Sequence, residues 1–152
     1  MAEFIYNEVQ LVQPGAAAVL NTAIGCNRGM VLHRPGSGIL TLRGMVNNPC
    51  CRFARYRVAF DGNIAVPEGG TAGEIQLALA IDGEIIPTSI AAATPAAAEQ
   101  YCNVNGFAII DVPAGCCYTV SVENASVSAD PATTPAAALN VRNLNVEVTR
   151  IA

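Results

Sequence analysis

The stretch that decides the fold is residues 55–86, RYRVAFDGNIAVPEGGTAGEIQLALAIDGEII, which carries apolar residues at alternate positions on both sides of a glycine-rich corner. Apolar and polar residues that alternate with a period of two predict a strand with one buried face. The first row is Tyr56, Val58 and Phe60, the corner is Pro67-Glu68-Gly69-Gly70, and the second row is Ile75, Leu77, Leu79 and Ile81. Asp82-Gly83 supplies the positive-φ pair of a tight turn, so residues 79–81 should fold back on Ile85-Ile86. The stretch therefore predicts a core built from a long β-hairpin.

The alternation continues along the rest of the chain and indicates an all-β protein. Further strands are predicted at residues 4–12, 37–46, 107–112, 117–124 and 139–151. Turns such as Arg34-Pro35-Gly36 separate them, and Pro95 predicts a loop within the alanine-rich residues 91–100. About eight to ten strands without a helix predict an antiparallel β-sandwich or barrel. The length of 152 residues suits one domain, 1–152, with residues 1–36 as its N-terminal strands and loops.

The composition indicates a protein whose surface is largely covered by other protein. Only 13% of the residues are charged, whereas a soluble monomer usually has about 25%. No run of roughly 18 apolar residues is present, so a membrane partner is not expected. The net charge is −4 and all eight basic residues are arginine, which disfavours nucleic acid as a partner. The spacing of Arg52, Arg55 and Arg57 favours interface ion pairs with Asp or Glu over a phosphate site. No secretory signal is visible after Met1.

Few residues offer chemistry, and neither an enzyme nor a cofactor is predicted. His33 is the single histidine, and no serine sits in a nucleophile elbow, so a catalytic triad is not expected. The loop carboxylates lack the convergent spacing that about six calcium ligands require, which applies to Asp61, Glu68, Asp111 and Asp130. The sequence Asn124-Ala125-Ser126 matches a glycosylation acceptor and is interpreted as a coincidence in a chain without a secretion signal.

The six cysteines include two vicinal pairs, Cys50-Cys51 and Cys116-Cys117, which lack the spacing of a zinc ribbon. In a chain made in the cytosol, cysteines are more often thiols than a disulfide framework. The favoured interpretation is small buried thiols in turns, and a disulfide or a four-thiolate metal site is the alternative. Cys26 and Cys102 have no assigned partner.

Several segments resemble the jelly-roll heads of the tumour necrosis factor and complement globular-head superfamily. They are FDGNIAVP at 60–67, the strand 75–81 with Gly83, VPAG at 112–115, VSVEN at 120–124 and NLNV at 143–146. The similarity covers most of the chain from about Ser37 onward and is nearest to bacterial and bacteriophage members. The resemblance implies a jelly roll of about ten strands in a tight homotrimer, with the first and last strands adjacent at its centre and both termini at one end. In such a fold the strand ending near Val46 runs antiparallel to the strand starting near Cys117, so the two vicinal pairs should converge.

The resemblance implies a structural function. Unlike the spore-surface relatives, the chain has no collagen repeat and so no stalk, which favours a trimer seated directly on a particle surface. We expect a trimeric virion component, a phage capsid decoration or head-fibre protein at the virion surface. Its expected partners are further copies of itself, the major capsid protein or another particle-surface protein, and a host-surface glycan. The alternative is a trimeric surface-binding or glycan-binding head on a bacterial spore or cell.

Phe4, Ile5 and Tyr6 are the predicted anchor or trimer contact, because a strand so close to the chain start has no hairpin of its own to cover it. This strand is expected to lie beside residues 139–151, whose apolar row joins the predicted interface as Leu144, Val146 and Val148. The pattern does not decide between attachment to a particle and completion of the trimer core. Attachment through residues 25–36 is the third possibility.

Overall fold

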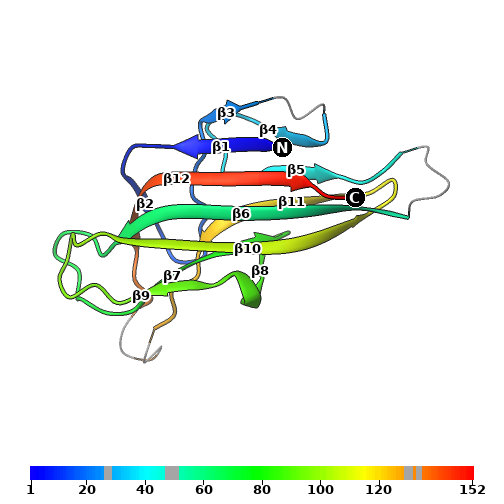
Figure 1. The fold of residues 1–152 in the computed structure, drawn as a ribbon. Coiled ribbons are helices and arrows are strands. Elements are labelled where there is room, and N and C mark those ends of the chain that lie inside the picture. The colour runs from blue at the N-terminus through cyan, green and yellow to red at the C-terminus, as the bar shows by residue number, and fades with distance from the viewer. Residues whose placement is uncertain (26–28, 47–51, 129–131, 133–134) are drawn as a thin grey trace.

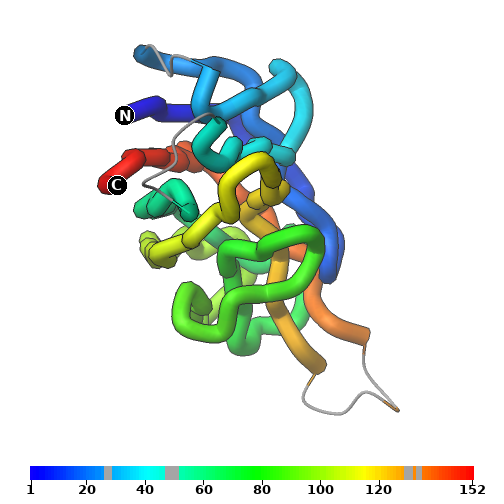
Figure 2. Tube along the Cα trace, turned by 90° about the vertical axis from the view of Figure 1, so that its right-hand side faces the viewer, coloured from blue at the N-terminus to red at the C-terminus, as the bar shows by residue number. Residues whose placement is uncertain are grey.

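The computed structural model describes residues 1–25, 29–46, 52–128, 132 and 135–152, which form two antiparallel sheets packed face to face (Figures 1 and 2). Sheet A contains β1 (Ala2–Tyr6), β2 (Gln10–Val12), β3 (Thr22–Ile24), β6 (Phe53–Ala65), β10 (Cys102–Pro113) and β12 (Leu139–Arg150). Sheet B contains β4 (Val31–His33), β5 (Leu40–Arg43), β7 (Ile75–Ile81), β8 (Glu84–Ile85), β9 (Ala91–Ala93) and β11 (Cys117–Asn124). One turn of 3-10 helix, η1 (Pro87–Ser89), follows β8. Among the described residues, no helix has the length and apolar character to cross a membrane.

The strand order is β10-β6-β12-β1-β3 in sheet A and β4-β5-β11-β7-β8 in sheet B, with β2 beside β12 and β9 beside β7. All these pairings are antiparallel, and most join strands that are distant in the sequence. The predicted all-β, antiparallel jelly-roll sandwich is confirmed. The strands number twelve over the described part of the chain, rather than about eight to ten, because several are only two or three residues long.

The predicted long hairpin within residues 55–86 is wrong, because β6 and β7 belong to different sheets. The corner between them carries the chain from one sheet to the other, and β6 pairs with β10 and β12 instead. Alternation shows that a strand has one buried face, but it does not show which strand lies beside it. The short β7–β8 hairpin is confirmed, since Ala80 lies opposite Ile85 and the turn residues Asp82 and Gly83 have φ angles of 50° and 84°.

The core lies between the two sheets and contains the apolar rows that the alternation predicts. Five of these side chains are at most 2% exposed, namely Tyr56, Val58, Phe60, Leu77 and Leu79. The middle of β7 departs from the expected pattern, because Ala78 and Ala80 on its other face are also fully buried. This strand therefore has two buried faces over part of its length.

The N-terminal strand pairs with the C-terminal strand, as predicted. Ala2 lies opposite Val148, and this pairing places both termini at one end of the sandwich (Figure 1). The expected single strand 4–12 is instead two strands, β1 and β2, which both pair with β12. A register shift in β12 lies between Arg142 and Asn145, and Asn143 within it has a φ angle of 50°. Such a bulge locally breaks the ladder and bends the strand.

Other boundaries change because of pairing between distant segments. The expected loop at residues 91–100 begins with β9, where Ala93 lies opposite Ile75 of β7. The expected strand 107–112 is part of a longer strand, β10, which pairs with β6 along its whole length from Cys102 to Pro113. The expected strand 37–46 shortens to β5.

Candidate functional site

The outer face of sheet A, which points away from the core, carries large apolar side chains at both of its long edges. On β10, Phe107 is 55% exposed and Ile109 is 49% exposed, and on β3 at the opposite edge Ile24 is 47% exposed. Polar and charged side chains of β6, β12 and β1 lie between these edges. An exposed apolar surface with this composition is typical of a protein–protein contact.

Arg55 and Asp111 form a two-point ion pair across β6 and β10 on this face. The Arg55 Nε donates to Asp111 Oδ1 and Nη2 donates to Oδ2, each at 2.7 Å. Arg57 lies 3.6 Å from the carboxylate of Glu147 on β12, measured from Nη1 to Oε1. Arg55 and Arg57 therefore pair with acidic residues of the same chain, whereas the sequence predicts ion pairs across an interface.

The same arginines lie over aromatic rings. The guanidinium carbon of Arg55 is 5.1 Å from the ring centre of Phe53, and that of Arg57 is 5.4 Å from the ring centre of Phe107. Cation–π contacts of this kind hold the long side chain against the sheet. The resulting surface combines aromatic rings with arginines that are already ordered, which is the composition enriched in protein interfaces.

We expect the Arg55–Asp111 pair to stabilise the folded chain slightly at neutral pH and to lose this contribution in acid. Hydrogen bonds from Arg55 lower the pKa of the Asp111 carboxyl below its ordinary value, against a weaker opposing effect of partial burial. A pKa that is lowered in the folded state contributes stability above the unfolded pKa, and this contribution is lost as the pH falls through the folded pKa. Solvent screens the pair, because its side chains are 42% and 43% exposed, so the contribution is small.

Urea titrations of the wild type and Asp111→Asn test this dependence. The variant should be slightly less stable than the wild type at about pH 7, and the difference should be smaller at about pH 3, below the ordinary pKa of an aspartate carboxyl. An equal difference at both pH values would show that the carboxylate charge does not contribute.

Glu3 and Glu147 lie directly opposite each other on β1 and β12. Glu147 has Arg57 beside it, whereas Glu3 accepts a hydrogen bond from Asn145 Nδ2 at 2.7 Å and has no arginine within ion-pair distance in the described part of the chain. Like charges in directly opposite positions weaken a strand pair. The Asn145 Oδ1 atom is buried and has no hydrogen-bond partner. In the described part of the single chain, the centre of the face therefore holds a carboxylate without an arginine partner and an amide oxygen without a hydrogen-bond donor.

The predicted anchor and interface residues divide between the core and the surface. Four of them are at most 2% exposed and belong to the core of the chain itself, namely Phe4, Leu144, Val146 and Val148. The prediction that they are available for another molecule is wrong for these four, because sheet B covers the inner face of β1 and β12. Ile5 and Tyr6 remain half-buried.

Phe107 and Ile109 are the members of this face that sequence reasoning missed. Residues 107–112, FAIIDV, predict a strand, but the apolar residues stand on both of its sides. Ala108 and Ile110 enter the core at 5% and 3% exposure, and Phe107 and Ile109 alternate with them on the outside. A strand that is apolar on both faces is typical of one covered on both sides. The apolar residues on both sides of this strand were the sequence signal that could have identified Phe107 and Ile109 as part of an outer contact.

The vicinal cysteines Cys116 and Cys117 are free and exposed, which corrects their interpretation as buried thiols. Cys117 is the first residue of β11 and lies opposite Arg43 of β5, so the predicted antiparallel arrangement of these strands is confirmed. The possible partners Cys50 and Cys51, and also Cys26, lie outside the described residues. Cys102 is free and half-buried. The thiolate cluster therefore stays a prediction.

The remaining candidates have defined surroundings. The His33 Nε2 atom lies 3.0 Å from the backbone oxygen of Ser37, and its ring packs 5.0 Å from that of Phe4. Within the described ranges, no three His, Cys, Asp or Glu side chains are grouped to hold a metal ion, and Asp130 lies outside them. Asn124 is 1% exposed and donates its amide to the backbone oxygens of Val12 and Ala137. A glycan could not be carried by this amide in the folded chain.

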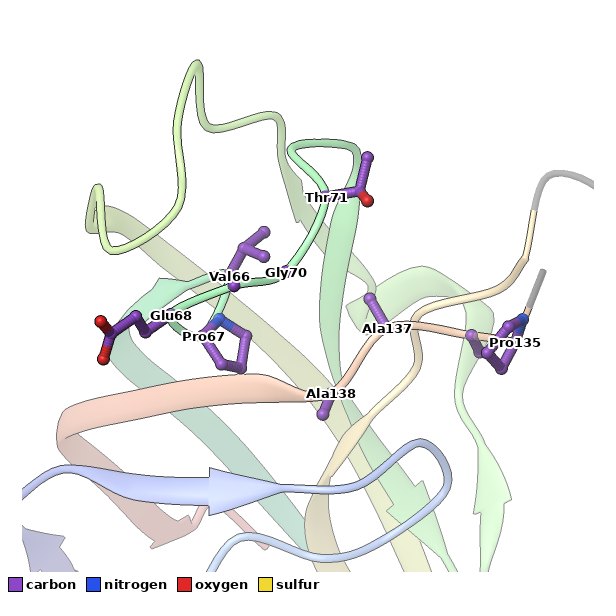
Figure 3. A pocket seen from close by; sticks show the side chains of 10 residues that line it. Val66, Pro67, Glu68, Gly70, Thr71, Pro135, Ala137 and Ala138 are labelled. Carbon is purple, nitrogen blue, oxygen red and sulfur yellow. The ribbon is translucent and has the colours of Figure 1, made fainter.

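A hollow of about 470 Å³ lies at the end of the sandwich opposite the termini, between residues 66–71 and residues 135–138 (Figure 3). Its walls consist mainly of small or rigid side chains, among them Val66, Pro67 and Ala137. Figure 3 shows the Glu68 carboxylate pointing away from residues 135–138. The hollow therefore lacks an inward-directed charge that would orient a ligand.

Comparison with known proteins gives no match to a family model and no match to a curated protein. Two solved structures are similar over nearly the whole chain. The globular domain of zebrafish complement 1qA protein has a TM-score of 0.57 and 14% identity, covering 96% of this chain and 94% of that one. Eiger TNF from S. frugiperda has a TM-score of 0.57 and 10% identity, covering 100% of this chain and 92% of that one. The chain therefore has the jelly-roll fold shared by tumour necrosis factor and complement globular-head proteins.

Proposed function

We propose that this chain is the subunit of a homotrimeric structural head that assembles through the outer face of sheet A. The observation that carries the proposal is the exposure of Phe107 and Ile109 on β10, with Ile24 exposed at the opposite edge of the same face. A closed ring of identical subunits joins two different surfaces of each subunit. The apolar groups at the two edges of the face can serve as these two surfaces, so that the β10 edge of one subunit contacts the β3 edge of the next.

Charge and composition support the same assembly. Arg55 and Arg57 are neutralised by Asp111 and Glu147 before any contact forms, so burying them does not leave an unpaired charge. Only 13% of the residues are charged, which suits a chain with a large covered surface. The resemblance noted from the sequence implies a homotrimer as well.

Light scattering on the purified chain tests the assembly. We expect a mass three times the 15.7 kDa of one chain that persists on dilution to about micromolar concentration, as obligate interfaces above roughly 2,000 Å² do. A mass near 15.7 kDa under these conditions would contradict the proposal.

We further propose that the trimer decorates a phage capsid or its head fibres, with the major capsid protein as its partner. The fold places both termini at one end, which leaves the opposite end of the sandwich free to face outward from a particle. The resemblance of the sequence motifs to bacteriophage members of the superfamily supports a location on a phage particle. The proposed function requires neither catalysis nor a cofactor.

Immunogold electron microscopy with antibodies raised against the purified domain tests this location. Regular labelling of the capsids or fibres of native particles is the expected result. Labelling of spores or cell surfaces, with unlabelled particles, would favour the alternative of a surface-binding head.

A further inference from the structure

A second concave site lies on sheet B, around the turn that joins β4 to β5. Two adjoining cavities of about 380 and 410 Å³ share Arg34 and Ser37. The first is lined by Leu32, His33, Arg34, Ser37, Ile39 and Thr41. The site lies on sheet B, whereas the proposed assembly face lies on sheet A.

The turn that carries Arg34 is held in one conformation. The Ser37 backbone nitrogen donates to the Arg34 oxygen at 3.0 Å, and Gly36 has a φ angle of 84°, as a type II turn with proline at its second position requires. The Ser37 oxygen accepts hydrogen bonds from the Leu20 nitrogen at 3.1 Å and from His33 Nε2 at 3.0 Å. Little ordering is therefore needed before a ligand binds.

Two side chains that line the cavities, Arg34 and Ser37, have hydrogen-bond donors without partners among the described residues. The Arg34 guanidinium has no ion-pair or hydrogen-bond partner among the described residues, in contrast to Arg55 and Arg57. The Ser37 Oγ accepts a hydrogen bond from the Ile39 nitrogen at 3.1 Å, which leaves its own proton available to a ligand. No carboxylate lines either cavity. An arginine fork with an adjacent hydroxyl suits a planar carboxylate.

The apolar part of the site restricts what can carry that carboxylate. Leu32 and Ile39 are 50% and 49% exposed beside Arg34, and no Phe, Tyr or Trp ring lines either cavity. A sugar ring would lack the flat aromatic platform on which it could stack, whereas an aliphatic side chain can pack between Leu32 and Ile39. We propose that this hollow binds the C-terminal carboxylate of a partner peptide that ends in an aliphatic residue, with Arg34 on the carboxylate and Leu32 and Ile39 on the side chain.

NMR titration of the full, isotope-labelled chain with acetyl-Ala-Ala-Val-Leu tests the proposal. The backbone amide signals of Leu32, Ser37, Ile39 and Thr41 should shift with the free acid. The same peptide with a C-terminal amide should bind about tenfold more weakly or worse, because it loses a charge-assisted hydrogen-bond pair. Arg34→Gln should show a similar loss. Arg142→Gln removes the same charge from sheet A and should bind like the wild type.

Other results would overturn the proposal. Equal binding of the acid and the amide, or unchanged binding by Arg34→Gln, would show that Arg34 does not recognise a carboxylate. Tighter binding of N-acetylneuraminic acid or of inorganic sulfate at the same amides would show that the hollow selects a different anion. The comparison of the two peptides uses only the wild-type chain, so it decides the question even if a variant folds poorly.

Discussion

Ile109→Asp is expected to convert the assembled protein into monomers that keep the native fold. Ile109 is 49% exposed in the single chain, so its replacement removes little from the core. The new carboxylate would stand directly opposite Arg57, where the single chain tolerates a negative charge. Within an interface the same carboxylate must lose its water, and a buried apolar contact of this kind is worth about 2 kcal/mol or more. Each contact should therefore weaken by a factor of roughly thirty or more.

Light scattering measures the mass, and circular dichroism checks the fold. Ile39→Asp is the matched control, because Ile39 is also 49% exposed but immediately precedes β5 of sheet B. It should leave the mass unchanged. A trimer that survives Ile109→Asp, or one that dissociates with Ile39→Asp, would exclude the outer face of sheet A as the assembly surface.

Leu79→Ala should destabilise the folded chain by about 2 to 5 kcal/mol, through the lost burial of the side chain and the cavity left behind. Leu79 has no exposed surface and belongs to the core between the sheets. Its backbone nitrogen donates to Ser89 Oγ at 2.9 Å, and this bond survives the substitution, so the effect reports side-chain packing.

Denaturant titration at one fixed protein concentration measures the change, since dissociation would otherwise contribute to it. Leu11→Ala is the control, because Leu11 is 56% exposed, and it should change the free energy of unfolding by less than about 0.5 kcal/mol. A change below about 1 kcal/mol for Leu79→Ala would mean that the neighbouring side chains refill the space or that this row is not the core.

Several features of the fold follow from short-range rules and were predictable. The alternation of Tyr56, Val58 and Phe60 identified their buried face, because side chains on a strand point to opposite sides in turn. The Asp82-Gly83 turn followed from the need for two positive φ angles in a tight hairpin. The pairing of the first strand with the last, and the termini at one end, came from the family resemblance.

The candidate site was less predictable, because it depends on contacts between distant segments. The sequence predicts that the strand carrying Phe4 is too close to the chain start to be covered, yet pairing with β12 and packing against sheet B bury the Phe4 side chain completely. The exposure of Ile109 was hidden in a pattern that is apolar on both sides, which cannot distinguish the core from an outer contact. The absence of a partner for Arg34 among the described residues also depends on which carboxylates the fold brings near.

The amino-acid sequence by itself determined that this chain is all-β, where most of its strands lie, which face of several of them is buried and where its tight turns occur. These properties depend on residues within about one strand length of each other, through the period-two geometry and the φ requirements of turns. Only the tertiary structure decided that β6 lies between β10 and β12, that β12 carries a bulge at Asn143, and which side of β10 faces outward. Antiparallel backbone hydrogen bonds form between almost any two strands, so the choice of neighbour rests on how all the buried faces pack together.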